Sequence, residues 1–265
     1  MGNIKEIIVG RDQNAPCVAY GDDSCYEEIL TYAFAIVHRV NLKVAESAIN
    51  EVKSNYCFPN NMSLHCRILF NEAARRKQGL SHIKSEDAQN MILKIISTVN
   101  DICLLRYAYF VTPPNFDFER QWKTPFQNAN GGDPLNVPIK YDKKGILNLL
   151  MNVCFTVPAD GKKGPTSEKC QIFVSEDPTR IHFIGSMRRR ADSWASGSSD
   201  VNAPPGCSFK LDPVVLKSTD AVLLQLADVY SYICAHAHSQ IGGNAFFKDA
   251  LSKIKYKSSG VLNLG

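Results

Sequence analysis

Acidic residues occupy three places in the sequence where divalent-metal chemistry could be carried out. The pairs Asp22-Asp23 and Glu176-Asp177 each follow a short apolar run that is typical of a strand, and Asp228 interrupts an apolar helical segment. Two hard cations ~3.5–4 Å apart are held by carboxylates that converge from several elements, and together they promote phosphodiester cleavage. The three places therefore predict a metal site, provided that folding brings them together.

Asp228 is the most informative of these acids, because its sequence neighbours are apolar. Gln225 precedes it by three residues and so shares its face of the predicted helix. A carboxylate in apolar surroundings is costly unless it is paired or bound to a metal. A buried salt bridge, or a cap to a neighbouring loop, is the structural alternative, and we favour the functional interpretation. Asp22-Asp23 and Glu176-Asp177, each taken alone, are more typical of solvated turns.

The other candidates for chemistry are weaker. His65 follows an apolar leucine and could equally be a core histidine, while His236 and His238 lack further zinc ligands that the sequence can place. Arg188, Arg189 and Arg190 are candidates for nucleic-acid binding, as is the run 75–77 (Arg-Arg-Lys). Three consecutive residues spread around a helix, which favours a solvated face for both runs. No phosphate-binding glycine loop and no hydrolase nucleophile motif is present.

The elements that would position these residues alternate between strands and helices after an opening hairpin. Strands are predicted at 17–20, 29–38, 107–111, 170–174 and 209–216, the last at a sheet edge because it contains Pro213. Helices are predicted at 41–56, 85–103, 144–155, 181–195, 221–238 and 245–254. This order predicts an α/β fold, a mixed sheet with an opening antiparallel hairpin and further parallel strands, flanked by helices.

The predicted domain organisation is simple. Residues 1–265 are expected to form one domain, with a long loop or lid at about 113–140 and a short helical C-terminal extension at about 240–265. The loop is rich in Asn, Gly and Pro. Its aromatic residues could stack on nucleic-acid bases or pin the loop to the domain; they are Phe116, Phe118, Trp122 and Phe126.

Bulk composition excludes several classes of protein. The chain is 45% hydrophobic and 21% charged, which argues against a disordered protein and against a coiled coil. Nine cysteines without a CxxC motif, and no apolar leader, predict a reducing, cytoplasmic location. No apolar stretch is long enough to predict a membrane span. The net charge of +4 permits nucleic acid as a partner without requiring it.

Four short motifs together resemble a known family. The segment 20–25 (Tyr-Gly-Asp-Asp-Ser-Cys) resembles the Tyr-x-Asp-Glu-Ser-Gly opening of the domain-of-unknown-function family numbered thirty-eight hundred. Residues 64–66 (Leu-His-Cys) resemble its Leu-His-Ala step, and 175–177 (Ser-Glu-Asp) its acidic pair after a central strand. Lys217-Ser218 followed by 224–228 (Leu-Gln-Leu-Ala-Asp) resembles its Ser…Leu-Gln-x-Ala-Asp signature. The matches run from about residue 17 to residue 235.

The resemblance implies an RNase H-like fold and a metal-dependent nuclease of bacteria, phages or mobile elements. The positions that match the family's catalytic residues are Asp22, His65, Glu176 and Asp228. Of these, Asp22, Glu176 and Asp228 would bind the metal, and Gln225 would support them. Ser24 and Asp177 are further supporting positions, and Asp23 stands where the family has Glu.

We therefore expect a nuclease that uses Mg²⁺ or Mn²⁺ to hydrolyse phosphodiester bonds. The first alternative is a catalytically inactive RNase H-like module that binds nucleic acid, a protein partner or a second copy of itself as a homodimer. A second alternative, a structural or inhibitory partner in phage defence or mobile-element biology, rests on the family association alone.

Overall fold

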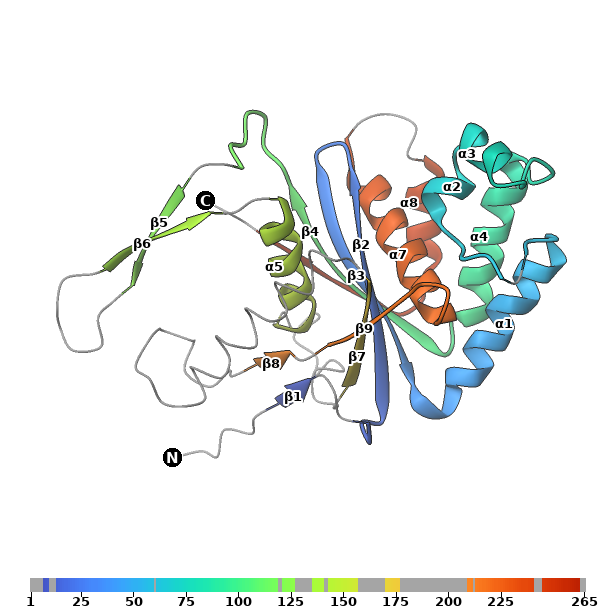
Figure 1. Ribbon diagram of the computed structural model, residues 1–265, viewed down its shortest axis with the longest axis horizontal. Helices are drawn as coiled ribbons and strands as arrows, with labels where there is room; N and C mark the ends of the chain where they lie inside the picture. The colour runs from blue at the N-terminus through green and yellow to red at the C-terminus, as the bar shows by residue number, and fades with distance from the viewer. Residues whose placement is uncertain are drawn as a thin grey trace.

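The computed structural model describes residues 7–9, 13–59, 61–118, 121–126, 135–140, 143–156, 170–176, 209–211, 213–240 and 245–262. At its centre lies a six-stranded mixed sheet with the order β10-β4-β3-β2-β7-β9 (Figure 1). Its strands are β2 (Cys17–Tyr26), β3 (Ile29–His38), β4 (Cys103–Val111), β7 (Cys170–Ser175), β9 (Val214–Leu216) and β10 (Lys257–Val261).

The direction of the strands confirms the predicted class of fold. Strands β2, β3 and β4 are antiparallel neighbours. Strand β7 then runs parallel to β2, and β9 runs parallel to β7 at one edge of the sheet. The chain thus has the α/β mixed sheet, opening on an antiparallel hairpin, that was predicted for an RNase H-like domain. The single strand predicted at 209–216 is divided into two strands, and the second of them, β9, takes the predicted edge position in this sheet.

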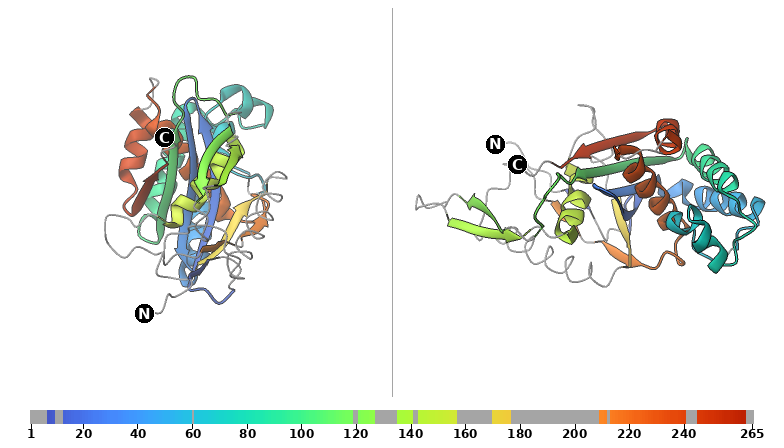
Figure 2. Two further views of the ribbon diagram at one scale, coloured as in Figure 1. Left: turned by 90° about the vertical axis from the view of Figure 1, so that its left-hand side faces the viewer. Right: turned by 90° about the horizontal axis from the view of Figure 1, so that it is seen from above.

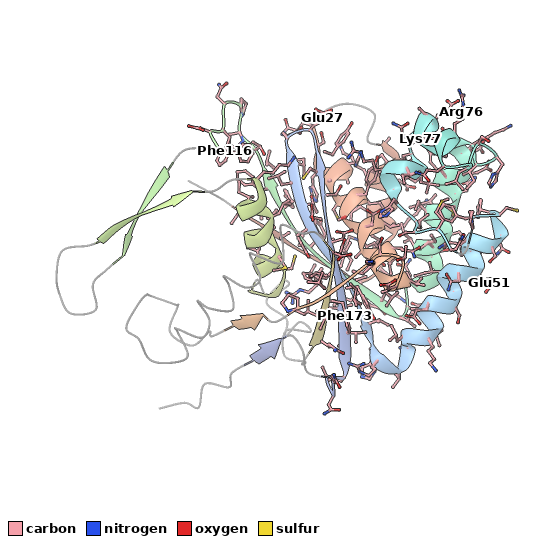
Figure 3. The ribbon with its side chains drawn as sticks, in the orientation of Figure 1. Glu27, Glu51, Arg76, Lys77, Phe116 and Phe173 are labelled. Atoms are coloured by element: carbon pink, nitrogen blue, oxygen red, sulfur yellow. The ribbon has the colours of Figure 1, made fainter. Side chains whose placement is uncertain are left out.

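The β2–β3 hairpin is longer than the sequence indicated. We predicted that the first strand ends at Tyr20 and that the acids form a turn, and this is wrong. Every residue of β2 pairs with β3, which is almost entirely apolar, so that Asp22 lies opposite Ala33. The turn lies instead at Glu27, whose φ is 48° and which marks the tip of the hairpin in Figure 3.

Helices cover both faces of this sheet (Figures 1 and 2). One face carries α1 (Leu42–Asn55), α4 (Ser85–Val99), α7 (Val222–His238) and α8 (Ala245–Lys253), with the short helices α2 (Cys66–Leu69) and α3 (Glu72–Lys77) beside them. The 3-10 turn η1 (Arg39–Asn41) leads into α1. The other face carries α5 (Lys143–Thr156). Alternate strand residues supply two cores: Val18 and Tyr20 pack on the α7 side, whereas Cys17 and Ala19 pack on the α5 side.

Two regions differ from their predicted form. The range predicted as a loop or lid contains β5 (Gln121–Phe126) and β6 (Leu135–Lys140), which pair as an antiparallel hairpin. The C-terminal extension contains β10 as well as helix α8, and β10 pairs in parallel with β4. Near the N-terminus, β1 (Ile7–Val9) pairs with β8 (Phe209–Leu211). The helix predicted at 181–195 lies outside the described residues.

Membrane-spanning helices were not expected. Within the residues that the structure describes, no helix combines the length and apolar character needed to cross a bilayer.

Candidate functional site

Helix α7 holds the segment that carries His65 through two backbone amides. The Leu64 N–H donates to Gln225 Oε1 at 3.0 Å, and the Cys66 N–H donates to Asp228 Oδ2 at 2.8 Å. Gln225 and Asp228 are three residues apart, so both side chains leave the helix on the same face. The two motifs, 161 and 162 residues apart at these bonds, are therefore in direct contact.

Gln225 joins four parts of the chain. Its Oε1 also accepts a hydrogen bond from Lys53 Nζ of α1 at 3.0 Å, while its Nε2 donates to the Ser218 carbonyl at 3.2 Å. Lys53 Nζ donates in turn to the Met62 carbonyl at 2.9 Å. The buried Gln225 amide thus forms hydrogen bonds with helix α1, with the segment before His65 and with the turn before α7. This supports the predicted positioning role of Gln225.

Lys53 is a functional candidate that our reading of the sequence missed. Its side chain is almost completely buried, at 1% exposure, and burial lowers its pKa. The signal was present, because Lys53 lies four residues after the buried Ile49 and one after the buried Val52, on the apolar face of α1. A lysine at such a position is a buried cation that must find acceptors, and here both acceptors are neutral oxygens.

His65 faces a carboxylate and is open to solvent. Its Nδ1 lies 3.7 Å from Asp228 Oδ1, and its Nε2 lies 3.5 Å from Ser218 Oγ. Interaction with Asp228 raises the pKa of His65, the charge of Asp22 adds to this, and burial opposes both. The His65 side chain is 39% exposed, which argues against the alternative of a core histidine.

Asp22 lies inside β2, on the face of the sheet that packs against α7. Like Tyr20, two residues earlier, it belongs to the α7 side by strand alternation, and it is only 8% exposed. Its Oδ1 accepts a hydrogen bond from the Asp23 N–H at 3.0 Å. The preceding Gly21 is required by close packing, because a Cβ there would lie 2.4 Å from the Phe34 ring. Since Asp22 contributes to the raised pKa of His65, we group them with Asp228 as the Asp22–His65–Asp228 cluster.

The remaining predicted site residues that the structure describes are divided between the two faces of the sheet. Asp23 and Ser24 are half-buried residues of β2, and strand alternation places Asp23 on the α5 side and Ser24 on the α7 side, like Asp22. Glu176 is exposed just beyond β7, where its N–H donates to the Leu216 carbonyl at 2.7 Å. The same alternation assigns Glu176, with Val174, to the α5 side. Asp177 and the run 188–190 lie outside the described residues.

The cluster offers oxygen donors for a divalent cation without forming a complete cage. In the described ranges, no group of three or more His, Cys, Asp or Glu side chains could hold a metal ion. Mg²⁺, however, is usually bound by one or two carboxylates, with water and substrate phosphates as the other ligands. Asp22 and Asp228 fit that requirement, since Asp228 Oδ1 lies beyond hydrogen-bonding distance of His65. The donor set therefore fits an ion shared with substrate.

Comparison with known proteins adds no further assignment. No family model matches the chain, and no curated protein matches it.

Proposed function

We propose that the chain is an RNase H-like phosphodiesterase that uses Mg²⁺ or Mn²⁺ to cleave nucleic acid at the Asp22–His65–Asp228 cluster. One observation carries the proposal: Asp228 Oδ1 of helix α7 lies 3.7 Å from Nδ1 of the partly exposed His65, and Asp22 lies on the face of the sheet that packs against the same helix. Carboxylates that converge from separate elements, beside a proton donor, are what metal-dependent phosphodiester hydrolysis requires.

Charge supports this proposal. The cluster contains two carboxylates and one imidazole, so its negative charge exceeds what protonated His65 can neutralise. Asp228 is 19% exposed and His65 is more exposed still, so an ion and a substrate phosphate can reach them from solvent. A partly exposed site of net negative charge attracts a divalent cation before it accepts an anionic phosphodiester.

Each residue has a defined role in the proposal. Asp22 and Asp228 would hold the ion, whereas Glu176, which lies on the α5 side of the sheet, has no role at this cluster. When bound, the ion would neutralise charge on the phosphodiester and make water a stronger nucleophile. His65, protonated more readily because of its raised pKa, would hydrogen-bond a phosphate oxygen or donate its proton to the leaving oxygen.

The resemblance to the family numbered thirty-eight hundred is part of the same proposal. It is supported by the direct contact between residues 64–66 and the signature on α7, because motifs that resemble one family would be expected to meet in its site. A role in phage defence or mobile-element biology depends on this resemblance, whereas the proposed cytoplasmic location depends on the nine cysteines without a CxxC motif.

A cleavage assay tests the proposal. Purified protein is incubated with single- and double-stranded DNA and RNA in Mg²⁺ or Mn²⁺, beside the variants Asp22→Asn and Asp228→Asn. We expect cleavage by the native chain and none by these two variants, and a loss of ~100-fold or more for His65→Gln. Asp249→Asn is the matched control, because Asp249 is an exposed residue of α8 that pairs only with Lys253 in the described structure.

Thermal melts establish that each variant is folded. Equal activity in native protein and Asp22→Asn, or no cleavage of any substrate by the folded native chain, would contradict the enzyme proposal.

One observation favours the alternative of a non-catalytic binding module. Asp228 Oδ2 is already occupied by the Cys66 N–H, so fixing the segment 64–66 is by itself a structural reason for this acid. The same assay separates the two functions. A binding module would retain affinity for nucleic acid without cleavage, and Asp22→Asn would leave that affinity unchanged.

A further inference from the structure

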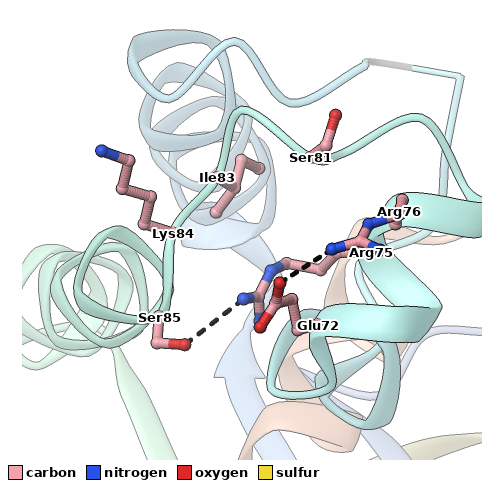
Figure 4. Close-up of a pocket in the computed structure, with 7 residues that line it drawn as sticks. All are labelled: Glu72, Arg75, Arg76, Ser81, Ile83, Lys84 and Ser85. Carbon is pink, nitrogen blue, oxygen red and sulfur yellow. Dashed lines mark hydrogen bonds and ion pairs between the residues drawn. The ribbon is translucent and has the colours of Figure 1, made fainter.

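We propose that a second site, the pocket between α3 and the start of α4, binds a phosphate group. The pocket has a volume of about 280 Å³, and its lining includes Arg75, Arg76, Lys84 and Ser85 (Figure 4). A single water occupies ~30 Å³ in the liquid, so a tetrahedral oxyanion has ample room. None of the lining residues belongs to the Asp22–His65–Asp228 cluster, so this inference does not depend on the proposed nuclease function.

Arg75 is the residue that indicates a missing anion. It is only 3% exposed, and its guanidinium donates to the Leu69 carbonyl and, at 3.3 Å, to Ser85 Oγ. Its buried Nε has no hydrogen-bond partner among the described residues. Within the same ranges no carboxylate forms an ion pair with Arg75, since Glu72 is engaged by Arg76 at 3.0 Å.

A buried guanidinium with only neutral acceptors is unfavourable, because desolvation of the charge is not offset by an opposite charge. An oxyanion in the pocket would offset that cost. A phosphate group is the best match, because guanidinium donors lie in one plane and can bind two phosphate oxygens at once. Arg75 reaches across the pocket toward Ser85, which places its charge along the pocket wall (Figure 4).

The other residues that line the pocket also favour an anion. Arg76 and Lys84 are exposed cations at the pocket, and Glu72 is its only acid. Three cations against one carboxylate leave a net positive charge, and the Ser81 hydroxyl adds a neutral donor. The backbone N–H of Lys84, which precedes α4, is not available to an anion, because the Asp87 side chain already accepts it at 3.0 Å. The side chains, led by Arg75, therefore form the site.

Inorganic phosphate is the first probe. It is titrated into the full-length chain at constant ionic strength, while NMR follows the Arg75 Nε–Hε signal and calorimetry measures the dissociation constant. We expect a saturable shift of that signal. The double variant Arg76→Gln/Lys84→Gln should weaken phosphate binding by roughly tenfold, since it removes two charge-assisted contacts while leaving buried Arg75 intact.

Lys77→Gln is the matched control. Lys77 is exposed on the same helix as Arg76 but does not line the pocket, and the two are labelled on α3 in Figure 3. It should bind phosphate as tightly as the native chain does. Absence of a saturable shift, or equal affinity in the double variant and the control, would overturn the proposal.

A second arm identifies the source of the phosphate. If the pocket takes a phosphodiester, a single-stranded DNA oligonucleotide binds the double variant more weakly than it binds Lys77→Gln, and inorganic phosphate competes with it. If the pocket takes free phosphate, the oligonucleotide has equal affinity for both variants. Either result supports a phosphate site, and neither depends on cleavage.

Discussion

One histidine, His65, lies beside helix α7 and another, His236, belongs to it, and their environments move their pKa values in opposite directions. His65 packs on the N-terminal half, where Asp228 and Asp22 raise its pKa. His236 belongs to the C-terminal half and is 6% exposed, and burial lowers its pKa to about 4. Its ring stacks on Tyr26 and Tyr232, with centroid distances of 3.6 and 3.9 Å.

The comparison teaches that the neighbours of a histidine decide its chemistry. Near His65 the helix presents Gln225 and Asp228, which bind backbone amides and leave the imidazole open to solvent. Near His236 it presents aromatic rings, and the His236 Nδ1 has only the Tyr232 carbonyl, at 2.9 Å, as its partner among the described residues. The first environment favours a charged ring that can exchange a proton. The second favours a neutral ring that packs, so we assign chemistry to the N-terminal half of α7 alone.

The largest expected effect is a loss of stability when the polar contacts of the N-terminal half of α7 are removed. Gln225→Leu should lower the free energy of unfolding by about 3 kcal/mol, because the buried Lys53 ammonium loses one of its two acceptors and the buried Leu64 N–H loses its acceptor. Urea denaturation measures the change. Lys53→Met should cost only about 1 kcal/mol, since it removes the buried charge instead of stranding it.

The double variant Lys53→Met/Gln225→Leu tests the mechanism. Its loss of stability should be smaller than the sum of the two single losses, as expected for residues in direct contact. Additive losses would show that Gln225 acts by packing and not as the acceptor of Lys53.

The parts of the fold that the sequence predicted well are those set by local pattern. Strand β3 is a nearly continuous apolar run, and α4 and α7 follow from apolar periodicity and from their length. Strand β10 was missed because its sequence, Lys-Ser-Ser-Gly-Val, is polar, and only pairing with β4 makes it a strand. The length of β2 was missed for the same reason, since pairing with β3 extends it through Asp22.

The candidate site likewise contains residues that local pattern predicts and partners that it does not. Asp228 was identified because an acid in an apolar helix is locally anomalous. Its partner, the Cys66 N–H, is 162 residues away and could not be inferred from local pattern. Lys53 was overlooked because a lysine in an amphipathic helix is normally solvated, although it lies on the apolar face of α1 that packs against α7. Local anomalies thus predicted single residues, and the tertiary structure supplied their partners.

The next effect is the dependence of stability on pH that arises from His236. The pKa of His236 is lower in the folded chain than the value of 6.5 expected when unfolded, so the unfolded state binds more protons as pH falls. Stability should therefore be lost between pH 6.5 and about 4, by about 2 kcal/mol at pH 5 relative to pH 8. His236→Phe should keep the stacking and remove this part of the pH dependence, as measured by urea denaturation at a series of pH values.

The exposed His82, changed in the same way to Phe, is the matched control and should leave the slope of stability against pH unchanged. An identical slope in His236→Phe and native protein would show that the ring is not held neutral by its burial.

The smallest effect tests whether electrostatics alone separates the two histidines. In metal-free protein, Asp228→Asn should lower the pKa of His65, because interaction with Asp228 is the largest cause of its rise. Asp22→Asn should lower it less, because Asp22 contributes only through its charge. NMR titration of the His65 ring measures both changes, and Asp249→Asn should leave the ring unaffected because Asp249 pairs with Lys253 on α8.

The sign of the linked stability change is opposite to that of His236. A raised pKa in the folded state stabilises the chain below the unfolded value of 6.5, and this contribution is lost as pH rises through the folded pKa. Asp228→Asn should therefore reduce the contribution that His65 makes to the free energy of unfolding at acidic pH. If Asp22→Asn leaves the His65 titration unchanged, the charge of the strand does not reach the imidazole. Asp22 would then be removed from the cluster, and the chemistry of α7 would depend on Asp228 and His65 alone.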